Sequence, residues 1–522
     1  MEDKVFLLAV AIAVLLIAVV SKLNPNLLPS STKPPKKKLN LPPGPWTLPV
    51  IGSIHHLPTG GPLIHRTLRD LAGEHGPLMM LRLGEVPTLV VTSPEAAREV
   101  TKTHDVAFAD RFVNATLSAL TFDATDMACA PYGERWRQLR KICVLELLSA
   151  SRVQSFSRIR EEEVARFLHT ISSAAAGAGD DGGAAAVDMS RGISEFINDT
   201  FMRECIGSRC KYQEEYDDAF HAAVRETSGM SVADLFPSSR VMGMLAMAPR
   251  RALACRHRMQ RVLEKVIEEK KEAMDRGDEA AQESFIGVLL RLQRDGSSPI
   301  ELTNDTIVAL MFDIFSAGSD TSASQLTWCM TELMRSPRVM TKAQAEVRKA
   351  FGEKERRITE EDLAMANLGY LKLVIKETMR MHPQLPLLIP RQCRETCKVM
   401  GYDIPKGTAV LINAWAISRD PKFWDDPEEF KPERFEDNDI DYKGTNYEYL
   451  PFGSGRRMCP GLNLGLANTN LVLASLLYHF DWKLPYGLEP KDVDATEAVG
   501  LIANKKTKLV LHPIARIALA KA

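Results

Sequence analysis

Apolar residues recur at intervals of three and four through most of the chain, which is the period of helices with one buried face. This spacing, at helical length, occurs at residues 155–168, 253–276, 304–335, 341–351 and 368–381. Segment 304–335 is long and apolar on most faces, so we expect a central, buried helix there. Strand-like pieces are short and lie at residues 79–83, 88–92, 409–413 and 509–512. The pattern predicts a mainly α fold with a minor β part.

The amino-terminal end has a different pattern. Residues 5–20 are an unbroken apolar run, which as a helix would be about 24 Å long. Extended to residue 23 it would approach about 28 Å, close to the endoplasmic reticulum bilayer of about 27 Å. Lysines follow the run at positions 33 and 36–38, so the positive-inside rule places the rest of the chain in the cytosol. We expect a single-pass membrane anchor at 1–23.

Two other interpretations of this run are a cleaved signal peptide and a buried core helix. A signal peptide has a shorter apolar core and a small-residue cleavage site, and a core helix usually has a polar face. After the run, a basic and proline-rich linker is expected at 24–52, because proline blocks helix formation. Residues 53–522 contain no repeat and no long linker, and we expect them to form one domain.

The composition narrows the functional classes. Basic and acidic residues number 66 and 67, for a net charge of -1, which argues against a nucleic-acid-binding protein. The nine cysteines are widely spaced and form no C-x-x-C pair. A zinc ribbon, a thioredoxin-like motif and a secreted disulfide scaffold are therefore disfavoured.

One cysteine lies in a distinctive segment. Residues 451–461 read PFGSGRRMCPG, with the spacing F-x-x-G-x-R-x-C-x-G. Glycines let the backbone approach a flat group closely, and nearby arginines favour the thiolate, the form of cysteine that binds metals. An apolar helix expected at 462–480 would help to bury the thiolate. The pattern indicates a cysteine thiolate bound axially to haem iron.

With this motif the chain resembles the cytochromes P450, which are haem-thiolate monooxygenases, from residue 41 to the C-terminus. The resemblance implies the cytochrome P450 fold and haem b as the cofactor. It implies that Cys459 is the iron ligand, that Phe452 packs near its sulfur and that Arg457 reaches a haem propionate. Further propionate contacts are implied at Trp136, Arg140 and Arg391. Indole and guanidinium groups are pure hydrogen-bond donors, which suits a carboxylate.

A second family motif is E-x-x-R at Glu377 and Arg380. Residues three apart share a helix face and can form an ion pair. The resemblance adds Arg434, in the PERF segment, as a second arginine on the same glutamate. We expect the three residues to form a structural lock.

The expected central helix contains AGSDTS at 317–322, a polar interruption in an apolar segment. This matches the family's oxygen-activation motif, so the resemblance implies that Asp320 and Thr321 deliver protons during oxygen activation. We expect the helix to bulge here and to leave a groove beside the iron.

The expected substrate pocket is apolar, which favours a hydrophobic substrate. It is expected to be lined by Leu310, Met311, Phe312, Ile314, Phe315, Ala317, Leu387, Leu388, Ile389, Val499 and Leu501. Asp313 is the acid among these positions, and the sequence does not place its carboxylate.

Several phrases resemble plant microsomal members, and most of all grass enzymes that oxidise terpenoids in defence pathways. They include FADR at 108–111, KAQAEVR at 342–348 and the segment 377–391. The chain departs from the family pattern at Gln384, where proline is common. The chain carries no flavin or nicotinamide motif. The resemblance therefore implies that electrons come from a membrane-bound NADPH–cytochrome P450 reductase, docking near Arg137, Lys141 and Arg456.

The sequence and the resemblance thus predict a membrane-bound monooxygenase that acts on a hydrophobic small molecule. A sesquiterpene or diterpene is the favoured substrate. A phenylpropanoid, fatty acid or alkaloid remains open as substrate. Two other classes are a hydroperoxide isomerase or dehydratase of the same fold and a non-catalytic haem sensor. The intact Asp320-Thr321 pair argues against the isomerase or dehydratase. The long helix with the oxygen motif and the apolar lining argue against the sensor.

Overall fold

The computed structural model describes residues 39–57, 63–177, 185–227, 229–278, 283–298, 300–352, 356–517 and 519. The expected anchor at 1–23 and linker residues 24–38 lie outside this range. In the described part of the chain, no helix is both long enough and apolar enough to cross a bilayer. Linker residues 39–52 pack on the body, since the Asn40 N–H donates to Asp403 Oδ2 (2.9 Å) and the Met80 N–H to the Pro43 carbonyl (2.8 Å).

Helices dominate the structure, which confirms the mainly α fold. The larger ones are α2 (Ile64–His75), α5 (Glu134–Ile142), α7 (Ser157–Ala176), α8 (Met189–Ile206), α9 (Gln213–Thr227), α12 (Ala248–Asp275), α14 (Phe285–Arg294), α15 (Asn304–Arg335), α16 (Pro337–Phe351), α18 (Gly369–Met381) and α20 (Leu462–His479). The shorter ones are α3 (Pro94–Arg98), α4 (Ala115–Leu120), α6 (Ala150–Ser155), α10 (Val232–Leu235), α11 (Arg240–Leu245), α17 (Glu360–Ala366) and α19 (Ala414–Ile417).

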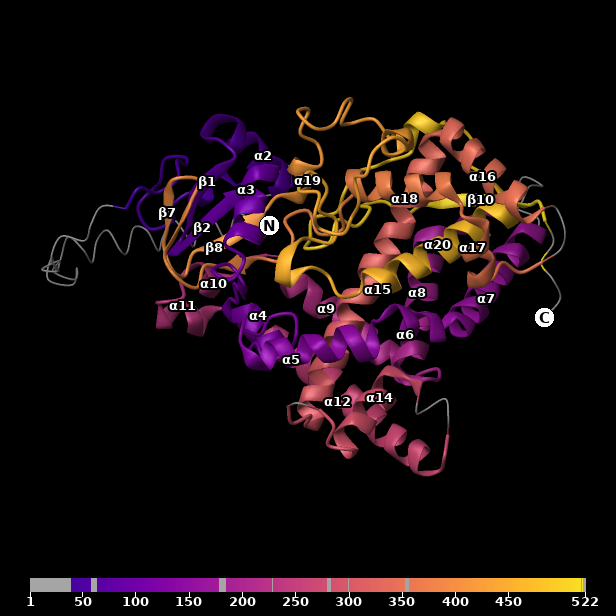
Figure 1. Cartoon of the computed structure of the whole chain (residues 1–522), viewed down its shortest axis with the longest axis horizontal. Helices are drawn as coiled ribbons and strands as arrows, with labels where there is room; N and C mark the ends of the chain where they lie inside the picture. The colour runs from indigo at the N-terminus through magenta and orange to yellow at the C-terminus, as the bar shows by residue number, and fades with distance from the viewer. Residues whose placement is uncertain are drawn as a thin grey trace, which may run out of the picture.

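In the described residues, the strands form three small sheets. They are β1 (Leu78–Leu83), β2 (Val86–Val91), β3 (Asp110–Arg111), β4 (Val187–Asp188), β5 (Arg391–Gln392), β6 (Cys397–Val399), β7 (Tyr402–Ile404), β8 (Ala409–Ile412), β9 (Phe480–Lys483) and β10 (Val510–Ala515). The largest sheet has the order β1-β2-β8-β5-β3, with β2 and β8 parallel and the other neighbours antiparallel. Figure 1 shows β1, β2 and β8 at one end of the molecule, and β10 among the helices toward the other end.

Helix α15 is the centre of the helical part. It has the bounds that the sequence predicts, and the Thr303 hydroxyl caps it by accepting a hydrogen bond from the Thr306 N–H (3.2 Å). Helices α8, α12, α18 and α20 pack around it. Because α15 is apolar on most sides, this cover on several faces is what its sequence requires.

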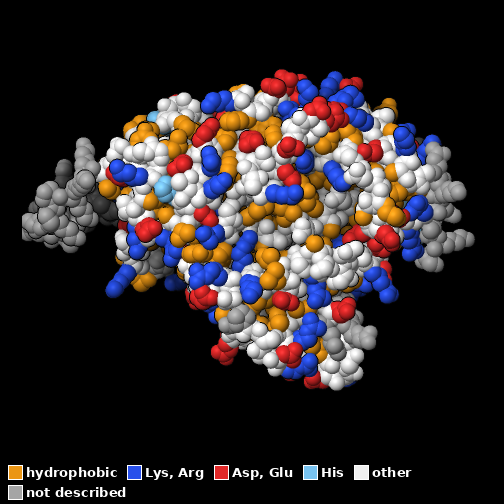
Figure 2. All heavy atoms as spheres, viewed as in Figure 1, with side chains coloured by type: hydrophobic (Ala, Val, Ile, Leu, Met, Phe, Trp, Pro, Cys, Tyr) orange, Lys and Arg blue, Asp and Glu red, His pale blue; other side chains and the backbone are white. Residues whose placement is uncertain are grey.

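Charges of both signs are mixed over the molecular surface. On the face shown in Figure 2, basic and acidic side chains are interspersed among hydrophobic ones. This distribution fits the near-zero net charge and gives that face no extended basic surface of the kind that nucleic acids need.

Candidate active site

The cysteine segment folds as a tight loop in front of α20. The Cys459 N–H donates to the Phe452 carbonyl (3.0 Å), which closes the loop. Gly453 and Gly455 have positive φ angles of 69° and 70°. A Cβ on Gly455 would come within 2.3 Å of the Thr101 carbonyl oxygen, so only glycine fits there. The loop therefore holds Cys459 in one fixed position.

The Cys459 side chain is accessible although protein atoms surround much of it. All nine cysteines lie in the described part of the chain, and Cys459 alone is exposed. Burial nevertheless raises the pKa of its thiol, while the Gly461 N–H and the Arg140 guanidinium act in the opposite direction. Cys143, which is buried, shows the same effect, since burial raises the pKa of its thiol to about 12. The Cys459 thiol is therefore accessible to a ligand while protein surrounds it on other sides.

Four arginines gather beside this loop. Burial lowers the pKa of Arg457 to about 10, and repulsion by Arg391 and Arg140 contributes. Burial, Arg457 and Arg391 likewise lower the pKa of Arg111 far below its usual value. Buried like charges of this kind are costly without a counter-charge, so the arginine cluster favours an anionic group.

Backbone carbonyls accept the hydrogen bonds of the cluster. The bonds are Arg140 Nη2 to the Met458 carbonyl (2.6 Å), Arg391 Nη2 to Ser454 (2.6 Å), Arg457 Nε to Ala109 (2.7 Å) and Arg111 Nη1 to Ile389 (2.7 Å). Asp105 pairs with Arg391 (3.4 Å) but is shared with Arg456 (3.1 Å), and the nearby Asp110 pairs with Arg394 (3.0 Å). A third carboxyl, that of Asp126, also lies near Arg457 and Arg111. The indole of Trp136 lies under Arg457, with 4.3 Å between the guanidinium carbon and the ring centroid.

The sequence alone does not predict that Arg111 belongs to the arginine cluster. Arg111 lies in the FADR phrase, which in the sequence indicates only a likeness to one branch of the family. Strand β3, which carries Arg111, pairs with β5, which carries Arg391, and this register brings the two arginines together. The arginine is therefore visible in the sequence, but only the strand pairing shows that it lies beside Arg391.

The polar segment of α15 presents one side to accessible space. Ala317 is exposed, and its neighbours Ser316, Gly318 and Asp320 are partly exposed. Thr321, four residues after Ala317, is also partly exposed and lies on the same face. The Thr321 hydroxyl donates to the Ala317 carbonyl (2.6 Å). Ala317 and Thr321 thus form the accessible side of the motif.

The expected bulge in α15 is absent, since the helix is continuous from Asn304 to Arg335. The physical reason is that the Thr321 and Ser319 hydroxyls bond to carbonyls one turn earlier without displacing the helical N–H groups. Gly318 serves packing instead: a Cβ there would lie 2.1 Å from the ring of Phe201, so glycine lets α8 approach.

Asp320 lies close to ionisable groups of α9. Burial raises the pKa of Asp320, and the charge of His221 opposes this shift. Burial also raises the pKa of Asp217 to about 6, with Asp320 contributing. Asp217 can therefore hold and release a proton near neutral pH, and Asp320 binds a proton more readily than a solvent-exposed carboxylate does.

A loop connects the α15 face to the arginine cluster. Asp313, one turn before Ala317, accepts hydrogen bonds from the N–H groups of Met127 (2.7 Å) and Ala128 (3.1 Å). The carbonyls of the same two residues accept from Trp136 Nε1 (3.1 Å) and Arg111 Nε (3.2 Å). The Asp313 carboxylate is therefore engaged with the loop and does not offer a charge to a substrate.

Asp126, which precedes Met127 in this loop, should make the stability of the protein depend on pH. Burial raises the pKa of Asp126 from 3.8 to about 7. The folded protein then holds a proton that the unfolded chain has already lost, so this group's contribution to stability falls as pH rises from about 4 to about 7. In Asp126→Asn this loss disappears, and the midpoint of thermal unfolding should fall less between about pH 5 and pH 7 than in the wild type. The exposed Asp437→Asn is the control, and parallel wild-type and Asp126→Asn curves would contradict the expectation.

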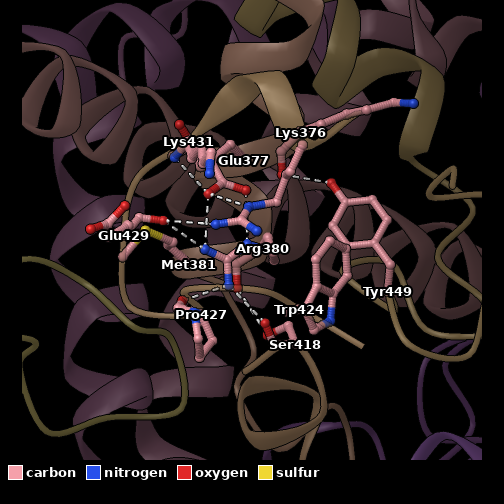
Figure 3. Close-up of polar contacts among 12 residues, drawn as sticks. Lys376, Glu377, Arg380, Met381, Ser418, Trp424, Pro427, Glu429, Lys431 and Tyr449 are labelled. Atoms are coloured by element: carbon pink, nitrogen blue, oxygen red, sulfur yellow. Dashed lines mark hydrogen bonds and ion pairs between the residues drawn. The ribbon is translucent and has the colours of Figure 1, made fainter. Parts of the chain in front are cut away.

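The expected lock residues meet in the interior, and Figure 3 shows Glu377 beside Arg380. Glu377 accepts from Arg380 Nε (2.8 Å) and Nη2 (2.9 Å) and from Arg434 Nε (3.0 Å). Glu377 and Arg380 are fully buried. Arg380 also donates to the carbonyls of Ser418 and Pro427 (2.8 Å each), so it joins α18 to the segment that leads toward Arg434.

The structure divides the expected pocket residues into two groups. Leu310, Met311 and Phe315 have almost no exposed surface in this structure and pack in the core. The reason is that α8, α12 and α14 also pack on α15; Phe315, for example, packs on Tyr216 of α9 at 4.9 Å between ring centroids. Phe312 and Ile314 are also nearly buried. Ala317 is exposed, Leu387, Leu388 and Ile389 are half-buried, and Val499 and Leu501 are 77% and 43% exposed.

The sequence matches the cytochrome P450 family model over residues 42–511. The chain belongs to the cytochrome P450 family. It is 64% identical over 518 residues to dolabradiene monooxygenase of Zea mays, with 99% of each chain covered. Zealexin A1 synthase of Zea mays is 63% identical over 519 residues, again with 99% of each chain covered. Ent-cassadiene hydroxylase of Oryza sativa subsp. japonica is 53% identical over 525 residues, covering 99% of this chain and 98% of the relative.

A solved structure supports the fold of this cytochrome P450. A zebra fish cytochrome P450 with abiraterone has a TM-score of 0.70 and covers 87% of this chain and 99% of its own, at 24% identity. As a member of this family the protein is a haem-dependent monooxygenase with haem b as cofactor.

The residues present fit haem b. An accessible thiol supplies the axial ligand type of this family, and the arginine cluster supplies positive charge in excess of its carboxylate partners. The two propionates of haem b are the counter-charge that such a cluster lacks.

Proposed function

We propose that this cytochrome P450 inserts one oxygen atom into a sesquiterpene or diterpene, using electrons from NADPH. Two features support a terpene: the relatives named for terpenoid oxidation, and an apolar lining at Ala317, 387–389, Val499 and Leu501 with the nearby Asp313 carboxylate engaged elsewhere. The likeness to dolabradiene monooxygenase over nearly the whole chain carries the proposal most directly. Co-expression with a reductase and a panel of terpene synthases tests it, and no oxygenated terpene from any member would refute it.

In this proposal each site residue has one role. Haem, when bound, activates O2 for insertion into a C–H bond. Cys459 would hold the iron, with Phe452 beside it. The propionates would be held by Arg111, Trp136, Arg140, Arg391 and Arg457. Glu377, Arg380 and Arg434 lock the framework, while Asp320 and Thr321 would supply protons for oxygen activation.

Replacing Thr321 by alanine should uncouple the enzyme. The hydroxyl is on the accessible face of α15, and positioned proton transfer contributes about 10²–10⁴ to rates. We expect product per NADPH to fall by about tenfold or more, with a matching rise in hydrogen peroxide. Ser319→Ala is a matched control, because its hydroxyl makes the same bond to the preceding turn (2.9 Å) but is buried on another face. Unchanged coupling in Thr321→Ala would contradict the assignment.

The proposed electron donor is NADPH–cytochrome P450 reductase. Arg137 and Arg456 are exposed and lie 5.7 and 5.5 Å from the ring centroid of Tyr132, and the exposed Lys141 is on the same helix as Arg137. This basic group next to the cysteine loop suits an acidic partner. Reversing the charge of Arg137 and Arg456 together should slow haem reduction by the reductase. An unchanged reduction rate would remove them from the interface.

The proposed location is the endoplasmic reticulum membrane, with the catalytic domain in the cytosol. The apolar run at 5–20 supports it, together with exposed apolar residues on the body. These are Val241, Met244 and Leu245 of α11, the adjacent Met247, and Trp46. Figure 1 shows α11 at the sheet end of the molecule, where linker residues 40 and 43 also pack. Release of the full-length protein from membranes by carbonate washing would refute the anchor.

A further inference from the structure

Gln384, where the sequence departs from the common proline, lies at a junction of three elements. Its side-chain Nε2 donates hydrogen bonds to Oε1 of Gln325 on α15 and to the His382 carbonyl (2.8 Å). Its own carbonyl accepts from the Ala503 N–H (2.9 Å). The bond to the His382 carbonyl requires a donor, which fixes the amide nitrogen on that side. One residue therefore joins α15 to two loops.

The partner on α15 lies next to the oxygen motif. Gln325 is one helical turn after Thr321, so Ala317, Thr321 and Gln325 follow one another along one side of the helix. Gln325 is buried. The contact between the two glutamine side chains thus fixes Gln384 relative to the helix face that carries Thr321.

The two loops carry the half-buried and exposed members of the expected pocket. The first, after Gln384, contains Leu387, Leu388 and Ile389, and Leu388 has a strained φ of 52°. The second contains Val499 and Leu501 and is tied to α15 where the Ala503 carbonyl accepts from Trp328 Nε1 (2.6 Å) and Ser324 Oγ (3.1 Å). Strain in a non-glycine residue persists only where surrounding contacts impose it.

The start of the first loop is fixed independently of Gln384. The ring of His382 stacks on Trp328 at 3.8 Å and contacts Glu332 Oε1 through Nε2 (2.9 Å). Glu497, at the start of the second loop, contacts His65 Nε2 (2.9 Å). These anchors hold the loop ends, and Arg111 Nη1 holds the far part of the first loop through the Ile389 carbonyl (2.7 Å). Between these anchors, the Gln384 side chain adds a direct contact from the first loop to α15.

We propose that the Gln384–Gln325 hydrogen bond is a specificity-determining contact, which sets the distance of the two apolar loops from Thr321 and thereby selects the carbon that is oxidised. This inference rests on the proposed terpene oxidation. A proline at 384 has no side-chain donor and leaves Gln325 without this partner. Gln384 is accordingly a positioning residue, since it acts through the loops.

The test measures the ratio of product isomers from each terpene that the enzyme oxidises, per unit of carbon monoxide-binding enzyme. Gln384→Met and Gln325→Met keep side-chain length but remove the bond. We expect each to change the isomer ratio by about fivefold, since a buried hydrogen bond contributes about 1 kcal/mol and about 1.4 kcal/mol corresponds to tenfold. If both act through one bond, the double variant should change the ratio no further. Either single variant suffices if the other does not fold.

Gln344→Met is the matched control, because it also removes a side-chain hydrogen bond, to the Phe480 carbonyl (3.1 Å), but far along the chain from both loops. Its isomer ratio should equal that of the wild type. An unchanged ratio in both single variants, or changes that add in the double variant, would overturn the inference alone. A wild-type enzyme that forms no oxygenated terpene would overturn the proposed function and this inference together.

Discussion

Cys459→Ser should abolish monooxygenase activity while leaving the fold intact. Serine is close in size and Cys459 is accessible, so little packing is lost. The thiolate supplies the electron density that favours O–O bond cleavage in this family. Losing several kcal/mol of such activation corresponds to about a thousandfold or more, at about 1.4 kcal/mol per tenfold. The measurements are product formation with reductase and the carbon monoxide difference spectrum, which should lose the band typical of thiolate ligation.

The control for this experiment is Cys210→Ser, a partly exposed cysteine outside the site. It should keep both the spectrum and the activity. A Cys459→Ser protein that retains the thiolate band would show that another residue binds the iron, and the site as built here would be wrong.

Glu377→Gln should destabilise the protein more than any surface change. Glu377 is the shared carboxylate of Arg380 and Arg434, and all three side chains are largely removed from solvent. The neutral amide leaves two guanidinium groups without their counter-charge. Breaking a buried pair in this way costs about 3–5 kcal/mol. We expect poor recovery of haem-containing protein and a marked fall in the midpoint of thermal unfolding.

Asp481→Asn provides the comparison. It removes the partner of Arg348 (2.8 Å), but Asp481 is 42% exposed and water screens the pair. An exposed pair contributes about 0–1 kcal/mol, so this variant should unfold close to the wild-type temperature. Equal losses in the two variants would contradict the proposed lock.

The sequence predicts local features of this fold well and long-range features poorly. Helix α15 has the bounds that its apolar pattern predicts, because a 32-residue periodic segment leaves little choice. The tight turn that holds Cys459 follows from glycines whose backbone angles other residues rarely adopt. The junction at Gln384 depends on residues far apart in the chain, Gln325 and Ala503, which no local pattern brings together.

The same contrast holds within the candidate site. Leu310 and Phe315 have the apolar character of pocket residues, but their burial depends on which helices cover each face of α15. Arg111 gains its place through strand pairing with the segment that carries Arg391. Charge and hydrophobicity are visible in a sequence, whereas the partner that neutralises or covers a side chain is set by tertiary packing.

Monooxygenase activity is tested most directly by an isotope experiment with the full-length protein, reductase, NADPH and a terpene hydrocarbon under ¹⁸O₂. We expect one ¹⁸O atom in the product, and we expect the product to form only when NADPH is present. A product that forms without NADPH, or that carries no label from ¹⁸O₂, would contradict this expectation.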